Sequence, residues 1–271
     1  MIGVLGGSGA IARALKDIER PKEYRFFSRD TSPDSGNNFD LSDSTTYRNV
    51  SNSDCETVLF LTALSSPSLC EQQPVESGIV NVEHTAKAIL HLLRSGHRVL
   101  FASSDLVYSG ASRAAYSESS SCKPRSVYGQ QKLEIERKFE SYDRFHSLRF
   151  SDVISRHTKY FSRVIRGRPD SFYSDVIRQP LCFQYLATLL RLDALEAIPK
   201  ILNLAGEEEM SRYQIAKLVF DGSKMADLVG EGRLPKSSIL PSVIRLDVSL
   251  LRKTLGVSPS IMTCNIHRLK E

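Results

Sequence analysis

The chain has 271 residues, of which 41% are hydrophobic and 25% are charged, and its formal net charge is +5. This length can bury a sizeable core, as one large α/β unit or as two domains, and the composition is that of an ordinary globular protein. The basic residues are scattered along the chain, which argues against a nucleic-acid partner but is compatible with attraction of small anions. No apolar run approaches the ~20 residues that span a bilayer, so no membrane partner is expected.

The five cysteines are far apart, odd in number and without Cys-x-x-Cys spacing. This pattern favours reduced thiols over disulfides. No set of His, Cys and carboxylate residues has metal-ligand spacing, so no metal is expected. Because the sequence also starts with a strand and shows no signal peptide, we expect a cytoplasmic protein.

A short apolar run at the N-terminus leads into a glycine-rich turn and then into a segment with helical spacing. The turn has the spacing Gly6-x-x-Gly9-x-x-Ala12. A strand, a glycine turn and a helix in this order are typical of dinucleotide binding, because backbone amides and the helix N-terminus meet the pyrophosphate. We therefore expect Gly6, Gly9, Ala10 and Ile11 to bind such a cofactor.

Residues 23–27 are predicted to form the second strand, whose end meets the adenosine ribose in this kind of fold. An acidic residue at that position favours NAD, whereas a nearby arginine suits the 2′-phosphate of NADP. Ser28 occupies the strand tip and Arg29 follows it, which favours NADP(H). Asp30 keeps NAD(H) as the alternative.

Two near-continuous apolar runs, residues 56–63 and 99–108, are typical of central strands in a parallel sheet. The second run contains two adjacent hydroxyl side chains, Ser103 and Ser104. Residues 80–93 lie between the two runs and have the apolar spacing of a helix.

Residues 126–136 are predicted to form a helix that carries Tyr128 and Lys132 on one face, with Cβ atoms about 5–6 Å apart. A tyrosine has an ordinary pKa of about 10, and a fixed positive charge nearby would lower it. The pair is therefore a candidate proton donor. A surface helix with a solvated lysine is the competing interpretation.

Together these features resemble the extended short-chain dehydrogenase/reductase family of the NAD-dependent epimerase/dehydratase superfamily, over nearly the whole chain. In that family a Ser or Thr at a strand end, a Tyr and a Lys form the catalytic set. Residues 103–108 are similar to the family's Ser-Ser/Thr-x-x-Val-Tyr/Phe strand end. The resemblance therefore implies Ser104, with Ser103 as the runner-up, together with Tyr128 and Lys132.

Two C-terminal passages are similar to the dTDP-4-dehydrorhamnose reductase-like branch that binds nucleotide sugars. One is Asn-x-Ala-Gly at 203–206 with Ser-Arg-Tyr at 211–213, and the other begins at Leu246. The implied fold is α/β, a Rossmann doubly wound parallel sheet with a smaller, interleaved C-terminal α/β substrate domain. The cofactor domain is expected to contain residues 1–155 and 181–205, and the substrate domain is expected to contain residues 156–180 and 206–271.

The resemblance also implies binding residues beyond the glycine turn. The expected cofactor contacts are Ser28, Arg29, Asp40, Leu41, Thr62, Ala63, Ser103, Tyr128 and Lys132. The expected substrate contacts are Ser65, Ser66, Ser104 and Asp105. Asp40 would accept from the adenine amine, although capping of the next helix is a competing role. Asn81 would fix the backbone near the tyrosine.

Four basic residues lie on and after a predicted short helix, namely Lys159, Arg163, Arg166 and Arg168. They are interpreted either as a site for the diphosphate of a nucleotide sugar or as a solvated surface.

The implied activity is NAD(P)H-dependent reduction of a keto group on a nucleotide-activated 4-keto-6-deoxy sugar, with Tyr128 as the proton donor. An epimerase, a reductase of non-sugar ketones and a non-catalytic NADP-binding regulatory homologue are the alternatives. A dehydratase is disfavoured, because Asp105 is not followed by the Glu that such enzymes commonly use. A homodimer is one assembly that the resemblance allows.

Overall fold

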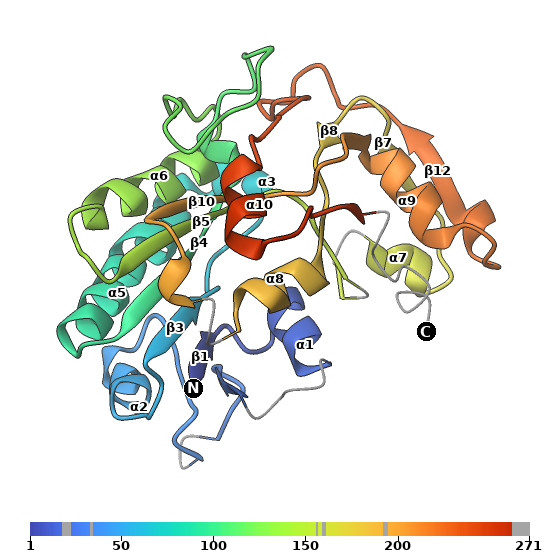
Figure 1. Ribbon diagram of the computed structural model, residues 1–271. Helices are drawn as coiled ribbons and strands as arrows, with labels where there is room; N and C mark the ends of the chain where they lie inside the picture. Colours follow the sequence, from blue (N-terminus) through green and yellow to red (C-terminus); the bar gives the residue numbers. More distant parts are fainter. Residues whose placement is uncertain (18–22, 33–34, 156, 159–160, 192–194, 262–271) are drawn as a thin grey trace. The chain divides into compact units, whose positions relative to one another are not determined.

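The computed structural model describes residues 1–17, 23–32, 35–155, 157–158, 161–191 and 195–261 (Figure 1). The chain divides into two compact units. Unit 1 contains Met1–Val107, Pro124–Arg149 and Ile198–Leu202, and unit 2 contains Tyr108–Lys123, Phe150–Ala197 and Asn203–Glu271. The division differs from the expected one in four places, because residues 108–123, 150–155, 181–197 and 203–205 belong to unit 2.

The centre of unit 1 is a six-stranded sheet in the order β10-β5-β4-β3-β1-β2. Its strands are β1 (Ile2–Leu5), β2 (Tyr24–Phe27), β3 (Thr57–Phe60), β4 (Arg98–Ser104), β5 (Phe145–Phe150) and β10 (Ile201–Leu204). The pairs β1–β2, β1–β3 and β3–β4 are parallel. The expected Rossmann-like sheet is therefore confirmed. The strand order reverses between β1 and β3, and ligands of such sheets bind at this point, beyond the carboxyl ends of the strands.

Within its described residues, unit 1 contains the three helices expected from the sequence, three short helices that were not expected, and one irregular stretch. The helices are α1 (Ala10–Lys16), α2 (Tyr47–Ser51), α3 (Pro67–Gln72), α4 (Pro74–Gly78), α5 (Thr85–Arg94) and α6 (Val127–Phe139), with 3₁₀ turns η3 (Ser44–Thr46) and η5 (Asp105–Val107). A π-helical segment, η4 (Ile79–His84), joins α4 to α5. Both α5 and α6 pack against β4 (Figure 1).

The core of unit 1 explains why β1, β3 and β4 are almost entirely apolar. Val58, Phe60, Val99 and Phe101 are fully buried in one cluster with side chains from α5 and α6. Burying a side chain of this size contributes roughly 1.5–3 kcal/mol. These strands are covered by helices, so their sequence shows a continuous apolar run rather than alternation.

Unit 2 is built from short elements around a separate core. Its strands are β6 (Val153–Ile154), β7 (Asp170–Tyr173), β8 (Ile177–Arg178), β9 (Leu181–Cys182), β11 (Met210–Ser211) and β12 (Val229–Gly232), which form three two-stranded sheets. Its helices are α7 (Ser162–Ile165), α8 (Phe183–Leu189), α9 (Arg212–Phe220) and α10 (Ser249–Leu255), with 3₁₀ turns η7 (Leu195–Ala197) and η8 (Ala226–Leu228). Phe161, Phe172 and Phe220 are buried together in its core.

Several local predictions for unit 2 can be compared with the structure. The sequence offers Ser211 as a candidate N-cap, and in the structure it caps α9 and forms a reciprocal capping box with Gln214. The sequence of residues 179–190 favours a helix over the whole stretch, but α8 begins only at Phe183, because Pro180 and a short strand precede it. Cys182 is disulfide-bonded, so the expectation of reduced thiols is wrong for this residue, whereas Cys55, Cys70 and Cys122 are free.

Cys264 lies outside the described residues. Within the part of the chain that the structure describes, no helix is long and apolar enough to cross a bilayer.

Candidate active site

The glycine-rich turn connects β1 to α1 within unit 1. Gly6 has a φ of +90°, a conformation that L side chains rarely adopt. The N–H groups of Gly6 and Gly7 both donate to the carbonyl oxygen of Phe27, at 3.1 and 2.9 Å. Gly9 is the extended N-cap residue of α1, and no side chain caps that helix end. Ala10 and Ile11 therefore begin α1 directly after the turn.

A buried hydroxyl without a partner lies against this turn. The Oγ1 atom of Thr62, which follows β3, is buried and has no hydrogen-bond partner among the described residues. A Cβ atom built on Gly6 would lie 3.4 Å from the same Oγ1 atom. Unpaired buried hydroxyls are costly, which indicates that this one serves a ligand. The turn and Thr62 together fit the phosphate and ribose groups of a dinucleotide.

The tip of β2 holds the residues expected to contact the adenosine ribose. The Ser28 Oγ atom lies 2.9 Å from the Thr31 Oγ1 atom, and Ser28 pairs with Asn38 in an isolated parallel bridge. The side chains of Arg29 and Asp30 are exposed at this strand end. A guanidinium placed here is accessible to a phosphate group in solution.

The expected adenine contacts, Asp40 and Leu41, belong to the next loop. The Asp40 Oδ1 atom accepts from the backbone N–H and the hydroxyl of Ser42, at 2.9 and 2.7 Å. The Leu41 side chain is buried, and its carbonyl oxygen accepts from the hydroxyl of Tyr47 at 2.7 Å. Asp43, not Asp40, caps the following 3₁₀ turn. Asp40 therefore does not have the capping role that was its alternative interpretation, because Asp43 has it.

The expected substrate loop is fixed to the helical segment η4 by a buried side-chain amide. Asn81 accepts from the N–H of Leu64 at 2.8 Å and donates to its carbonyl oxygen at 3.1 Å. Ala63 directly precedes this anchor. Ser65 and Ser66 follow it and are exposed, and Ser66 also caps α3 by accepting from Leu69.

Helix α6 is held against the end of β4 on both sides of Ser104. The Lys132 Nζ atom donates to the Ala102 carbonyl oxygen at 2.7 Å, two residues before Ser104. On the other side, a Cβ atom built on Gly129 would lie 2.2 Å from the carbonyl oxygen of Leu106, two residues after Ser104. The structure therefore brings Tyr128, which neighbours Gly129, to the strand end that carries Ser104.

The three predicted catalytic side chains are nearly buried and polar contacts hold them. Ser104 accepts from the N–H of Leu106 at 3.2 Å and donates to the Asp105 carboxylate at 3.3 Å. The Lys132 Nζ atom lies 5.6 Å from the centre of the Tyr128 ring and 4.5 Å from that of Phe101. Cation–π attraction and the Ala102 carbonyl oxygen thus fix the ammonium beside the phenol.

Burial shifts the pKa values of Tyr128 and Lys132 in opposite directions. The pKa of Tyr128 is raised, mainly by burial and further by Cys70 and Asp105. The pKa of Lys132 is lowered to about 7, because burial outweighs the negative charge of Glu136. The direction for Tyr128 is opposite to the expected one, since desolvation exceeds the effect of the ammonium. A tyrosine in this state is protonated at neutral pH and can donate its proton.

Several residues that support the site had not been identified from the sequence. Glu71 accepts from the N–H of Val127 at 2.5 Å and so caps the first turn of α6. Gln131 accepts from Asn81 at 2.8 Å and donates to Ser77 at 2.8 Å. These partners lie 50 or more positions apart in the sequence. No local pattern could therefore have paired them.

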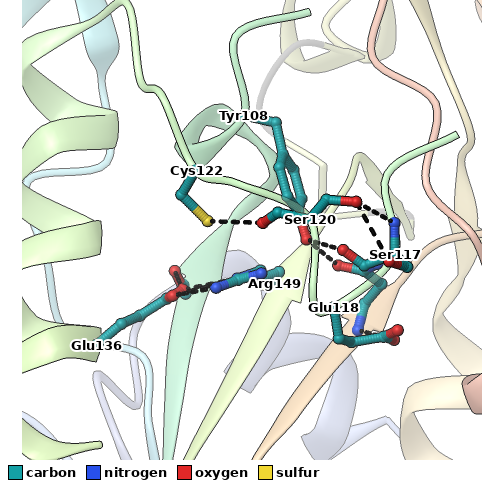
Figure 2. Close-up of polar contacts among 9 residues, drawn as sticks. Tyr108, Ser117, Glu118, Ser120, Cys122, Glu136 and Arg149 are labelled. Carbon is teal, nitrogen blue, oxygen red and sulfur yellow. Dashed lines mark hydrogen bonds and ion pairs between the residues drawn. The ribbon is translucent and has the colours of Figure 1, made fainter. Parts of the chain in front are cut away.

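A buried ion pair involves Glu136 of α6, one turn after Lys132. Arg149 on β5 binds both carboxylate oxygens of Glu136, with its NH2 atom 2.6 Å from Oε2 (Figure 2). The hydroxyl of Ser103 also donates to Glu136. This hydroxyl was expected to contact the cofactor, and in the structure it contacts the helix. Tyr128, Lys132 and Glu136 follow one another at intervals of four residues, so they lie on one face of the helix. This spacing is visible in the sequence and could have identified Glu136.

Unit 2 contains its own buried polar centre at the Asn-x-Ala-Gly passage. Asn203 donates from its side chain to the carbonyl oxygen of Tyr116 at 2.9 Å, and its backbone N–H donates to Glu118 at 3.0 Å. The hydroxyl of Tyr108 lies 3.1 Å from the Asn203 Oδ1 atom and 3.0 Å from the carbonyl oxygen of Ser117, a contact visible in Figure 2. The Asn-x-Ala-Gly passage, on which part of the resemblance rests, therefore contains a residue whose hydrogen bonds hold several segments of unit 2 together.

The basic segment of unit 2 gives little support to a phosphate site. Arg163 forms an ion pair with Asp170 at 3.7 Å and is exposed. The side chains of Arg166 and Arg168 are also exposed, and Lys159 lies outside the described residues. This arrangement is that of a solvated surface.

Comparisons with known proteins cover nearly the whole chain. The sequence matches the family described as RmlD substrate binding domain over residues 1–261. A protein named dTDP-4-dehydrorhamnose reductase from Sinorhizobium fredii (strain NBRC 101917 / NGR234) is 28% identical over 282 residues, covering 94% of this chain and 92% of the relative.

Solved structures share the same fold. A dTDP-4-dehydrorhamnose reductase from Bacillus anthracis str. Ames, in complex with NADP, has a TM-score of 0.81 and 16% identity, covering 99% of this chain and 96% of that one. MoeE5, in complex with UDP-glucuronic acid and NAD, has a TM-score of 0.74 and 23% identity, covering 95% of this chain and 93% of that one.

Proposed function

Because the chain belongs to the RmlD substrate binding domain family, we propose that it is an NAD(P)H-dependent reductase of a keto group on a nucleotide-activated sugar. The observation that carries the proposal is the double attachment of α6 to the end of β4. Lys132 binds Ala102 before Ser104, and Gly129 packs on Leu106 after it. This attachment supports joint action of Ser104, Tyr128 and Lys132 on one substrate atom.

The residues of unit 1 fit the cofactor. The glycine turn and Thr62 would hold its phosphate and ribose groups, and Lys132 would hold the nicotinamide ribose. When bound, NAD(P)H supplies the hydride for the carbonyl carbon. Arg29 at the tip of β2 favours NADP(H) over NAD(H), because an arginine there pairs with a 2′-phosphate.

The side chains around Ser104 supply the proton and the hydrogen bonds. Negative charge develops on the carbonyl oxygen when the carbon becomes tetrahedral, so a donor must deliver a proton at that moment. Tyr128 is this donor, since its phenol is protonated at neutral pH, although burial raises its pKa and so makes it a weaker acid than a free tyrosine. Ser104 donates a hydrogen bond to the same oxygen. Lys132 carries the nearby positive charge that favours the phenolate left behind.

The test is the fall in NADPH absorbance when purified protein is mixed with a panel of 4-keto nucleotide sugars, run in parallel with NADH. Turnover of at least one member, with NADPH preferred, is the expected result. An epimerase would interconvert sugars without net oxidation, and a non-catalytic homologue would bind the cofactor without turnover. No turnover with any sugar, despite tight cofactor binding, would exclude the reductase.

The cytoplasmic location and the homodimer belong to the same proposal. Cell fractionation tests the location. Light scattering of the purified full chain tests the assembly, and a mass of one chain would exclude the dimer.

A further inference from the structure

Two successive turns of α6 bind two successive residues of β4 in unit 1. Lys132 donates to the carbonyl oxygen of Ala102 at 2.7 Å. Glu136, one turn later, accepts from the hydroxyl of Ser103, the next residue along the strand. Both contacts lie immediately before Ser104, so they determine how this serine is presented to the helix.

The carboxylate of Glu136 binds one buried cation, Arg149, and acts electrostatically on a second, Lys132. Side-chain exposure is 5% for Glu136 and 3% for Arg149, and Lys132 is also 3% exposed. Arg149 binds Glu136 through three hydrogen bonds (Figure 2). Lys132 lies one turn from Glu136 on the same helix face, where side chains interact.

Stability alone does not account for this arrangement. Burying an ion pair costs several kcal/mol of desolvation per ion, and apolar side chains of similar volume often stabilise a core as well or better. A buried carboxylate beside a buried lysine does, however, keep the lysine charged. The titratable groups that face Lys132 are Glu136 and Tyr128 on its own helix and the Cys70 thiol on α3, whose raised pKa keeps it neutral. Arg149 on β5 acts through its pairing with Glu136.

We propose that Glu136, held by Arg149, is a positioning residue of the catalytic site, which fixes β4 against α6 through Ser103 and supplies the negative charge that balances Lys132. The carboxylate reaches neither the expected cofactor turn nor the substrate loop. It acts through Lys132, the buried cation one turn before it on α6. The kinetic part of this inference rests on the proposed reductase function.

The charge balance predicts the pH range in which Lys132 is an ammonium. Burial lowers its pKa to about 7, and Glu136 opposes this shift. An opposite charge within about 4–6 Å shifts a pKa by roughly one unit or more. Removing the charge while keeping the shape of the side chain therefore moves the lysine titration to lower pH.

The test compares Glu136→Gln with the matched control Glu134→Gln, an exposed glutamate on the same helix. NADPH affinity is measured from the fluorescence of the dihydronicotinamide between pH 5.5 and pH 9. The fall in affinity with rising pH is expected to move down by about one unit or more in Glu136→Gln. It is expected to stay in place in Glu134→Gln. An unmoved titration in folded Glu136→Gln overturns the inference.

A second variant separates charge from packing. Glu136→Asp keeps the negative charge but withdraws it from Ser103 and Arg149, so its Tm is expected to fall while the titration stays within about 0.3 units. If the pH dependence of NADPH affinity in Glu136→Asp moves together with the Tm, the inference is overturned. This result decides the question even where Glu136→Gln does not fold. Because the binding measurement needs no sugar, failure of the proposed reductase activity in the wild-type chain is a separate result.

Discussion

The close approach of α6 to the turn after β4 makes Gly129→Ala a sharp test of the site. A Cβ atom at this position would lie 2.2 Å from the carbonyl oxygen of Leu106 and 2.9 Å from its carbonyl carbon. Both are backbone atoms, so no side-chain rotation relieves the clash. The helix must move by roughly 1 Å, and a displacement of this size in an active site can cost about 100-fold in rate.

The same substitution also affects stability. Overpacking of this kind costs about 1–3 kcal/mol, so a lower Tm is expected together with the loss of kcat/KM. The matched control is Gly78→Ala at the end of α4, where a Cβ atom meets nothing within 4 Å. That position has helical backbone angles, so alanine there is expected to be neutral or to stabilise by up to ~1 kcal/mol.

The assays are NADPH-dependent reduction of a keto sugar and thermal unfolding, with all variants measured side by side. Wild-type kcat/KM and Tm in Gly129→Ala would refute the argument, because they would mean that a Cβ atom fits between α6 and the Leu106 carbonyl group. A loss of activity as large in Gly78→Ala would refute it as well, since the effect could not then be assigned to the contact with Leu106.

Three further predictions concern the proposed catalytic and cofactor residues. Tyr128→Phe should abolish keto reduction yet leave NADPH affinity nearly intact, and a variant with wild-type turnover would refute the role of the phenol. Arg29→Ala should raise the KM for NADPH far more than the KM for NADH, and equal effects would remove the argument for NADP(H). The third concerns pH: Lys132 has a pKa of about 7 when folded and about 10.4 when unfolded, so the unfolded chain binds more protons between these values. This lysine therefore destabilises the fold fully below pH 7 and less as the pH rises to about 10. The Tm advantage of Lys132→Met over the wild type should therefore shrink as the pH rises from 7 to about 10. A Tm difference that stays constant over this range would contradict the effect of burial on the lysine.

The sheet and the catalytic helix could be predicted because their sequence patterns are local. The apolar runs of β1, β3 and β4, the turn at Gly6 and the capping residue Ser126 are each visible within a few positions. Unit 2 was harder, since strands of two residues have no periodicity. Residues 147–154, for example, resemble a single strand of the family, whereas the structure has two strands there, β5 and β6.

The part of the site that could not be predicted depends on distant partners. Glu71 binds Val127 across 56 positions, and Asn81 binds Gln131 across 50. The direction of the Tyr128 pKa was also not accessible, because it depends on how deeply the phenol is buried. Sequence spacing reveals the neighbouring ammonium but not the loss of water around both groups.

The route of the backbone between the two units has a practical consequence. Each unit is assembled from three separate segments, so the backbone passes from one unit to the other five times. One of these excursions, Tyr108–Lys123, is inserted between Ser104 and Tyr128. No single truncation can therefore yield either unit as a continuous gene fragment. Engineering that aims to exchange sugar specificity must graft several loops at once, and swapping a terminal half would remove strands from the sheet that holds the coenzyme.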